Sequence, residues 1–458
     1  MNSQPASGRV APLGAIGCAI LLRALFLWAG WQGFFAGDEP GYLRFGDIWS
    51  TQGTYAGPWP PGLPWLISLA EQAFGLESGA RVLRVFQVLA SGWIAHWLWV
   101  LGRRLASERA GVAAAWIYAL HLPLVPSSHL LVAEQLHVAV LLPALALLLR
   151  AKNAAPGWGA CGLFALAGSL FAIAGLFRES LILMLPWLAW WLVRGMGVGR
   201  GLVGCGYLAS GLLLTSAPWA ARNLDVLGAW TPFGASSGGF IAAGWNGYYA
   251  DFDAQDVRAT TANRPFSGLR AALLAGPPEP WKAPRTSAHA VRTEESKRRA
   301  MGFAAAQPGW MLRTRVLYLA KAWTPLSDMV RYLRTRAYGG VLRSRGWVRA
   351  LGGLALLQSA GILLLGLWGW RTALDRDGTA LVGAALWSYV VLCLVMAMSR
   401  YRIPLETLLC VPAGAALMGG GTGRRNRGAW LLVGWLVAAW LLELPLVLAS
   451  IDDLAGAA

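Results

Sequence analysis

The sequence predicts an all-α integral membrane protein: a polytopic bundle of about eleven transmembrane helices, with outward-facing interfacial helices and one long extracytoplasmic loop. Of the 458 residues, 56% are hydrophobic and only 13% are charged, whereas a soluble domain carries about 25% charged residues. The chain also contains 26 Trp, and Trp is enriched where transmembrane helices cross the membrane surface. These features exclude an ordinary soluble enzyme and a disordered chain.

The predicted spans follow from hydropathy, because a transmembrane helix needs about 20 mostly apolar residues. Eleven candidate segments are 11–35, 84–102, 110–126, 130–149, 158–177, 180–193, 202–219, 350–370, 379–398, 403–420 and 429–449. Residues 63–75 are too short to span and contain Glu71, so they predict a helix lying on the membrane surface. The amphipathic stretch 308–324 predicts a second such helix.

The distribution of basic residues orients these helices. Thirteen Lys and Arg lie in the short loops on one side, and only Arg178, Arg400 and Arg402 lie in short loops on the other. Because Lys and Arg concentrate in cytoplasmic loops, the first side is expected to be cytoplasmic. The N-terminus is then inside, and segments 37–83 and 221–349 face outward.

This topology divides the chain into three parts. An N-terminal transmembrane module (1–220) carries the first outer loop, an extracytoplasmic loop region follows (221–349), and C-terminal transmembrane helices complete the chain (350–458). The loop region holds 19 Lys and Arg against 8 Asp and Glu, so anionic headgroups of membrane lipids or a phosphate substrate are expected partners. Nucleic acid is not expected, because the basic residues of this +17 chain lie between apolar runs.

Ionisable residues at membrane depth are costly and predict functional sites. Four such places fall on the outward side of the predicted topology, which indicates a single site. They are Asp38 and Glu39 with Tyr42; Glu134; Arg178; and Arg400, Tyr401 and Arg402.

The residue types at these places suit one class of reaction. A carboxylate at the membrane boundary can act as a base, and arginines can bind a phosphate through two hydrogen bonds. A sugar carried on a polyprenyl phosphate could therefore be attacked by an acceptor hydroxyl, while the arginines stabilise the departing phosphate. The five Cys and five His show no metal-ligand spacing, so no cofactor is expected, and the residues themselves leave a metal requirement open.

A set of short motifs occurs in a defined order along nearly the whole chain. They are Asp38-Glu39 with Tyr42; Trp59-Pro60-Pro61-Gly62-Leu63-Pro64; Glu134 after SSHLL; Leu176-Phe177-Arg178-Glu179; Pro218-Trp219-Ala220-Ala221-Arg222-Asn223; and Arg400-Tyr401-Arg402-Ile403-Pro404-Leu405-Glu406. This ordered set resembles the glycosyltransferases of the GT-C superfamily. The resemblance is greatest to the protein O-mannosyltransferases and the lipid A aminoarabinose transferases.

The resemblance implies a GT-C-like bundle with interfacial helices in the first outer loop. It also implies an inverting enzyme with a polyprenyl-phosphate-linked sugar donor, a lipid, glycan or protein acceptor, and no metal. Asp38 would be the catalytic base, and Glu39, the second catalytic residue, would orient the acceptor or the sugar. The implied substrate-binding residues are Tyr42, Glu134, Arg178, Arg222, Asn223, Arg400, Tyr401 and Arg402. The expected location is a bacterial inner membrane, with the active site on its extracytoplasmic side.

Two other functions stay open at this point. A transporter or flippase for an anionic lipid or a lipid-linked sugar would also use buried acids and arginines. The paired halves typical of transporters are absent from the sequence, however, and the ionisable groups gather at one face. A ligase or polymerase would transfer whole glycans rather than one sugar.

Overall fold

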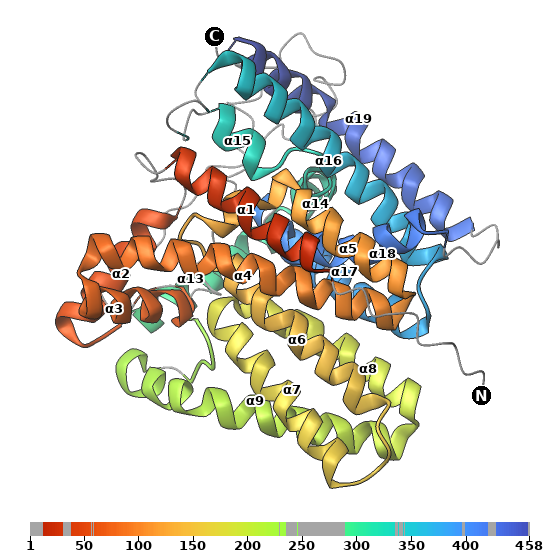
Figure 1. Ribbon diagram of the computed structural model, residues 1–458. Coiled ribbons are helices and arrows are strands. Elements are labelled where there is room, and N and C mark those ends of the chain that lie inside the picture. Colours follow the sequence, from red (N-terminus) through yellow and green to blue (C-terminus); the bar gives the residue numbers. More distant parts are fainter. Residues whose placement is uncertain are drawn as a thin grey trace.

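A computed structural model of the chain describes residues 12–30, 38–55, 57, 59–228, 230–234, 245, 289–334, 338, 342, 344–395, 399–419 and 427–456. The described residues form helices joined by turns and contain no strand, which confirms the predicted all-α class (Figure 1). Residues 235–244 and 246–288 of the predicted long outer loop lie outside the described residues, together with a few shorter stretches.

The described part of the N-terminal half forms nine α-helices. They are α1 (Leu13–Gly30), α2 (Glu39–Gln52), α3 (Gly62–Phe74), α4 (Leu76–Leu105), α5 (Glu108–Leu120), α6 (Glu134–Lys152), α7 (Trp158–Phe177), α8 (Leu185–Met196) and α9 (Val198–Leu227). The 3-10 turns η1 (Leu122–Leu124) and η2 (Pro126–Ser128) follow α5, and η3 (Glu179–Met184) precedes α8.

The C-terminal half adds seven more α-helices among the described residues. They are α13 (His289–Ala306), α14 (Pro308–Ala322), α15 (Asp328–Arg334), α16 (Arg345–Thr372), α17 (Arg376–Cys393), α18 (Ile403–Leu417) and α19 (Arg427–Gly456). The 3-10 turn η5 (Ser399–Arg402) leads directly into α18. Helix α14 forms where the sequence predicts a helix over 308–324.

Seven helices of the described chain are long and apolar enough to cross a membrane: α1, α4, α6, α7, α9, α16 and α19. Helix α5 together with η1 and η2 gives an eighth if this pair, bent by 62°, is counted as one span. The protein is therefore a multi-pass integral membrane protein. The remaining predicted spans form α8, α17 and α18, which are too short or not apolar enough to be counted with these helices. The predicted number of eleven spans therefore stays a prediction.

Polar side chains stabilise the break after α5. Gln358 of α16 accepts a hydrogen bond from the backbone N–H of Leu122 at 2.7 Å and donates to the carbonyl of Leu120 at 3.0 Å. Arg23 of α1 is fully buried and donates to the carbonyl of Tyr118 at 3.1 Å. Backbone groups released by a helix break need such partners inside a membrane, and the negative end of α5 favours a cation. A charged residue can therefore remain in the first span.

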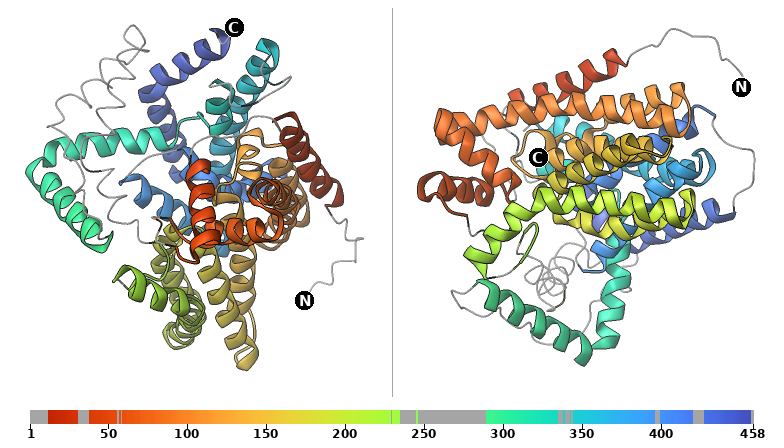
Figure 2. Two further views of the ribbon diagram at one scale, coloured as in Figure 1. Left: turned by 90° about the vertical axis from the view of Figure 1, so that its left-hand side faces the viewer. Right: turned by 90° about the horizontal axis from the view of Figure 1, so that it is seen from below.

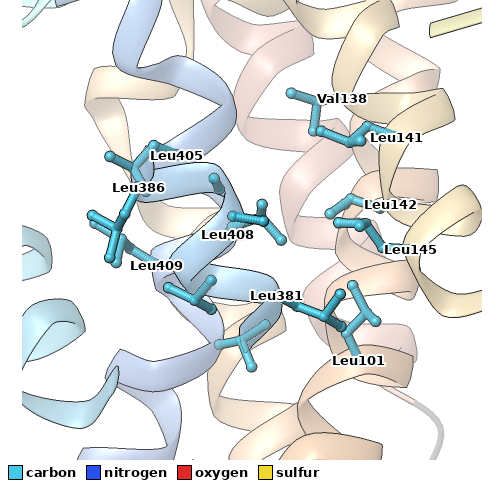
Figure 3. Close-up of a cluster of buried hydrophobic side chains, with 14 of the residues drawn as sticks. Leu101, Val138, Leu141, Leu142, Leu145, Leu381, Leu386, Leu405, Leu408 and Leu409 are labelled. Atoms are coloured by element: carbon cyan, nitrogen blue, oxygen red, sulfur yellow. The ribbon is translucent and has the colours of Figure 1, made fainter. Parts of the chain in front are cut away.

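The core lies around α6 and α18. Figure 3 shows Leu101 of α4 beside leucines of α6, α17 and α18. The most apolar stretch of α6 is 78% buried, against 22% for that of α19. A helix that is apolar on all sides belongs at the centre of a bundle, which explains the place of α18. This helix packs against α4, α5 and α6, so contacts cross the three-part division of the sequence, which itself stays a prediction.

The first outer loop folds into α2 and α3, which lie together at one end of the bundle (Figures 1 and 2). Helix α3 confirms the helix predicted over 63–75. Leu63 and Ile67 of α3 are buried with Leu83 of α4 and Leu136 of α6. These contacts seat the outer loop on the ends of two long helices.

The loops predicted to be cytoplasmic meet at the other end. Lys152, at the end of α6, forms an ion pair with Asp377 at 2.8 Å, and Trp191 of α8 donates to the same carboxylate at 3.0 Å. The N–H of Asp375 donates to the carbonyl of Leu105 at 3.2 Å. The structure therefore groups the two predicted sets of loops at different ends of the bundle.

Helices α7 and α9 approach through glycines, and this contact gives a stability prediction. A Cβ on Gly211 of α9 would overlap the backbone of Ala165, whereas a Cβ on Gly206 of the same helix would meet nothing within 4 Å. We expect Gly211→Ala to lower the thermal unfolding midpoint in detergent, because overpacking costs about 1–3 kcal/mol. Gly206→Ala should leave the midpoint unchanged or raise it. Equal midpoints for the two variants would contradict this packing.

Candidate active site

Four charged side chains from distant parts of the sequence meet beside α2. Arg400 donates from Nη2 to Oδ2 of Asp38 at 2.6 Å, and its Nε lies 3.1 Å from Oε1 of Glu134. Arg178 donates from Nη1 to the same oxygen of Glu134. Asp38, Arg400, Glu134 and Arg178 therefore form one continuous chain of ion pairs, which we call the charged cluster.

Helix ends bring these side chains together. Asp38 is the N-cap of α2, yet its side chain makes no capping hydrogen bond, so its carboxylate is available to Arg400 of η5. Glu134 lies in the first turn of α6, and Arg178 is the C-cap of α7. The helix dipole favours a carboxylate at the N-terminus of α6 and a cation at the C-terminus of α7.

Solvent exposure separates the two carboxylates of the charged cluster. The Asp38 side chain is 37% exposed, whereas that of Glu134 is 3% exposed. Asp38 can therefore contact a substrate, while Glu134 orients two guanidinium groups. Burial disfavours the charged form of Arg400, but the carboxylates of Glu134 and Asp38 outweigh this effect and raise the pKa of Arg400 well above its usual value. Arg400 is thus a permanent cation.

Tyr401 packs against both arginines of the charged cluster. The guanidinium carbon of Arg178 lies 4.6 Å from the centre of its ring, and that of Arg400 lies 5.9 Å away. Such cation–π contacts fix the position of a guanidinium. Burial also raises the pKa of the Tyr401 hydroxyl, so the ring stays neutral. Substrate binding by Tyr401 itself stays a prediction.

Tyr42 borders the charged cluster from α2. Its ring stacks on Trp59 with 4.6 Å between centroids, and a Cβ on Gly41 would overlap the indole of Trp59. Burial raises the pKa of Tyr42, and the nearby charge of Glu134 raises it further. Tyr42 therefore keeps its proton and can donate a hydrogen bond at this position.

Glu39 has different partners from its neighbour Asp38. It is fully buried, and its Oε1 accepts hydrogen bonds from Nη2 of Arg84 at 2.7 Å and from the N–H of Leu131 at 3.0 Å. These contacts fix the first turn of α2 against α4 and the turn before α6. These contacts give no support to the predicted catalytic role of Glu39. They indicate instead that Glu39 positions the turn that carries Asp38.

Arg402 lies two residues from Arg400 but has separate contacts. It is fully buried, and its Nη1 donates to the carbonyls of Ala322 at 3.0 Å and Thr324 at 2.6 Å. Its Nη2 lies 3.5 Å from Oε1 of Glu406. The predicted contact with phosphate is therefore not supported for Arg402, because its guanidinium binds the end of α14 instead.

Arg222 and Asn223 join the end of α9 to neighbouring segments. Arg222 donates from Nη2 to the carbonyl of Tyr55 in the first outer loop. Asn223 donates to the carbonyls of Thr231 at 2.9 Å and Phe233 at 3.2 Å. These bonds hold backbone segments in place, and substrate contact by either residue stays a prediction.

Sequence reasoning missed two residues near the site. Arg84, the partner of Glu39, occurs in an ordinary amphipathic stretch of α4. Burial and Asp328 raise the pKa of Tyr332 in α15, and the charges of Arg400 and Glu134 also act on it. Tyr332 therefore lies within range of the charges of Arg400 and Glu134, although nothing in the sequence of α15 distinguishes this helix.

No group of three or more His, Cys, Asp or Glu side chains in the described part of the chain is arranged to hold a metal ion. The arrangement instead combines an accessible carboxylate with two fixed guanidinium groups. Such a set can accept a proton at one point and bind an anion at another.

A family model described as dolichyl-phosphate-mannose-protein mannosyltransferase matches residues 59–218 of the chain. The matched region contains Glu134 and Arg178 of the charged cluster. Together with the ordered motifs, this match confirms the resemblance to the GT-C glycosyltransferases. No curated protein matches the sequence of this chain.

Solved structures give weaker likenesses. One is the archaeal oligosaccharyltransferase AglB from Archaeoglobus fulgidus in complex with an inhibitory peptide and a dolichol-phosphate, with 15% identity and a TM-score of 0.46 over 98% of this chain and 56% of that one. Another is ArnT from Cupriavidus metallidurans bound to undecaprenyl phosphate, with 13% identity and a TM-score of 0.34 over 89% and 78%. The chain spans about half the length of the oligosaccharyltransferase. These global likenesses are too weak to assign chemistry.

Proposed function

We propose that the protein is a membrane glycosyltransferase that transfers a sugar from a polyprenyl-phosphate donor to an acceptor hydroxyl. The observation that carries this proposal is the charged cluster, in which a partly exposed carboxylate is bonded to one of two clustered guanidinium groups. The family match over residues 59–218 supports the same reaction class. The acceptor is a lipid, a glycan or a protein.

Asp38 is the general base in this proposal. Its carboxylate takes the proton of the acceptor hydroxyl as the hydroxyl oxygen attacks the anomeric carbon of the sugar. The bond from that carbon to the phosphate oxygen breaks, and its electron pair remains on the phosphate. Attack from the face opposite the phosphate inverts the anomeric carbon. General base catalysis of this kind contributes about 10²–10⁴-fold in rate.

Arg178 and Arg400 bind the donor phosphate. Nε of Arg178 and Oε2 of Glu134 are buried and make no hydrogen bond to any described residue. Buried polar groups usually have partners, so these atoms offer one donor and one acceptor to substrate. Donors placed where negative charge develops are commonly the largest contribution to catalysis. Arg402, Glu39, Arg222 and Asn223 position the segments around this site.

The location of the site follows from the predicted topology. The charged cluster lies at the end of the bundle opposite the contact between Lys152 and Asp377. The basic loops at that opposite end are expected to face the cytoplasm, and this supports an extracytoplasmic position for the cluster. A bacterial inner membrane is the proposed setting, and the basic surplus of segment 221–349 would contact anionic lipids.

Purified protein in proteoliposomes tests the proposal. We expect transfer of radiolabelled sugar from a polyprenyl-phosphate-sugar to an acceptor fraction, with release of polyprenyl phosphate. Mass spectrometry of the product should show one added sugar. Movement of the lipid-linked sugar across the bilayer without bond cleavage would instead establish a flippase. Addition of a whole glycan would establish a ligase or polymerase.

A further inference from the structure

Arg400 contacts both carboxylates of the charged cluster. Its Nη2 donates to Asp38 at 2.6 Å, and its Nε lies 3.1 Å from Glu134. Arg178 contacts only Glu134 among the carboxylates of this cluster. The two arginines are therefore not equivalent, because only Arg400 is bonded directly to the proposed base.

The proposed reaction moves one negative charge from Asp38 to the donor phosphate. Asp38, Glu134, Arg178 and Arg400 carry two negative and two positive charges. A polyprenyl-phosphate-sugar is a phosphodiester that adds one negative charge. When Asp38 takes the acceptor proton and the phosphate leaves, one negative charge disappears from Asp38 and one appears on the phosphate. The total stays constant while the charge moves from one anion to the other.

We propose that Asp38 and the donor phosphate are alternative partners of Arg400, so that donor binding itself releases the carboxylate of Asp38 for proton transfer. This inference rests on the proposed function and deepens it by assigning Arg400 a role that Arg178 does not share. A guanidinium binds a carboxylate or a phosphate through the same pair of N–H groups. An arriving phosphate therefore competes with Asp38 for Arg400, and the acceptor hydroxyl meets an unpaired carboxylate only after the donor has bound.

Glu134 makes this exchange possible. It is 3% exposed and bonded to both arginines, so Arg400 keeps one anionic partner when its bond to Asp38 breaks. Asp38 is 37% exposed, so its carboxylate can turn toward an acceptor and be solvated. Glu134 therefore holds Arg400 in place while Asp38 separates from it.

A double-mutant cycle tests the competition. The probe is undecaprenyl phosphate, and its affinity is measured in detergent for the wild-type protein, Asp38→Asn, Arg400→Gln and the double variant. We expect Asp38→Asn to bind undecaprenyl phosphate about tenfold more tightly than wild type, since a charged competitor for Arg400 has been removed. In the Arg400→Gln background the same substitution should have no effect on affinity.

Asp47→Asn is the matched control, because it removes one negative charge from the same helix and Asp47 makes no contact with Arg400 in the described structure. It should leave the affinity unchanged. Unchanged or weaker binding by Asp38→Asn would overturn the inference, and so would an equal gain in the Arg400→Gln background. If the wild-type protein fails to bind undecaprenyl phosphate, the proposed function falls together with this inference. Wild-type binding without the Asp38 effect overturns only the inference.

Discussion

Asp38→Asn is expected to abolish glycosyl transfer while the protein remains folded. The amide has the shape of the carboxylate, and its oxygen can still accept the hydrogen bond from Arg400. It cannot take a proton from the acceptor hydroxyl, so kcat should fall by about 10³-fold or more. The measurement is transfer from a polyprenyl-phosphate-sugar under single-turnover conditions.

Two controls accompany this prediction. The thermal unfolding midpoint of Asp38→Asn should stay close to that of wild type, because the amide oxygen still accepts from Arg400 and Asp38 makes no capping hydrogen bond to α2. Asp47→Asn removes a charge from the same helix and should retain transfer. Full activity in Asp38→Asn would show that another group is the base. Together with tighter binding of undecaprenyl phosphate, the loss of transfer would separate the chemical step from donor binding.

Arg402→Met is expected to have the largest effect on stability. Arg402 is fully buried and binds the carbonyls of Ala322 and Thr324. Its loss also leaves Glu406 buried beside His121, whose Nε2 lies 3.6 Å from the carboxylate. Removing one partner of a buried ion pair costs about 3–5 kcal/mol. The thermal unfolding midpoint in detergent should fall sharply.

A second variant makes the interpretation of Arg402→Met specific. The pair Arg402→Met with Glu406→Leu removes both charges, and it should recover part of the lost stability, since apolar replacement of a whole buried pair is often neutral. If Arg402 instead binds the donor phosphate, Arg402→Met would unfold at the wild-type temperature with a raised KM. That outcome would restore the phosphate-binding role first expected for it.

Several parts of the structure follow from the sequence alone. Apolar segments of about 20 residues define spanning helices, because every backbone group in a bilayer must be bonded within the helix. The helix over 63–75 could be predicted to lie outside the spans, because it is too short to cross the bilayer. The charged cluster could also be anticipated, because Asp38, Glu134, Arg178 and Arg400 are charges that a membrane retains only at a cost.

Only the tertiary structure decided the partner of each charge. Arg400 and Arg402 look equivalent in the sequence, but the turn of η5 directs one to Asp38, 362 residues away, and the other to the end of α14. Adjacent Asp38 and Glu39 likewise differ, because Glu39 accepts a hydrogen bond from Arg84 of α4. Hydropathy and charge show whether a segment must be buried in the membrane and whether it carries a charge that needs a partner. Which carboxylate remains exposed depends on how distant segments pack, and a single sequence holds no local signal for that.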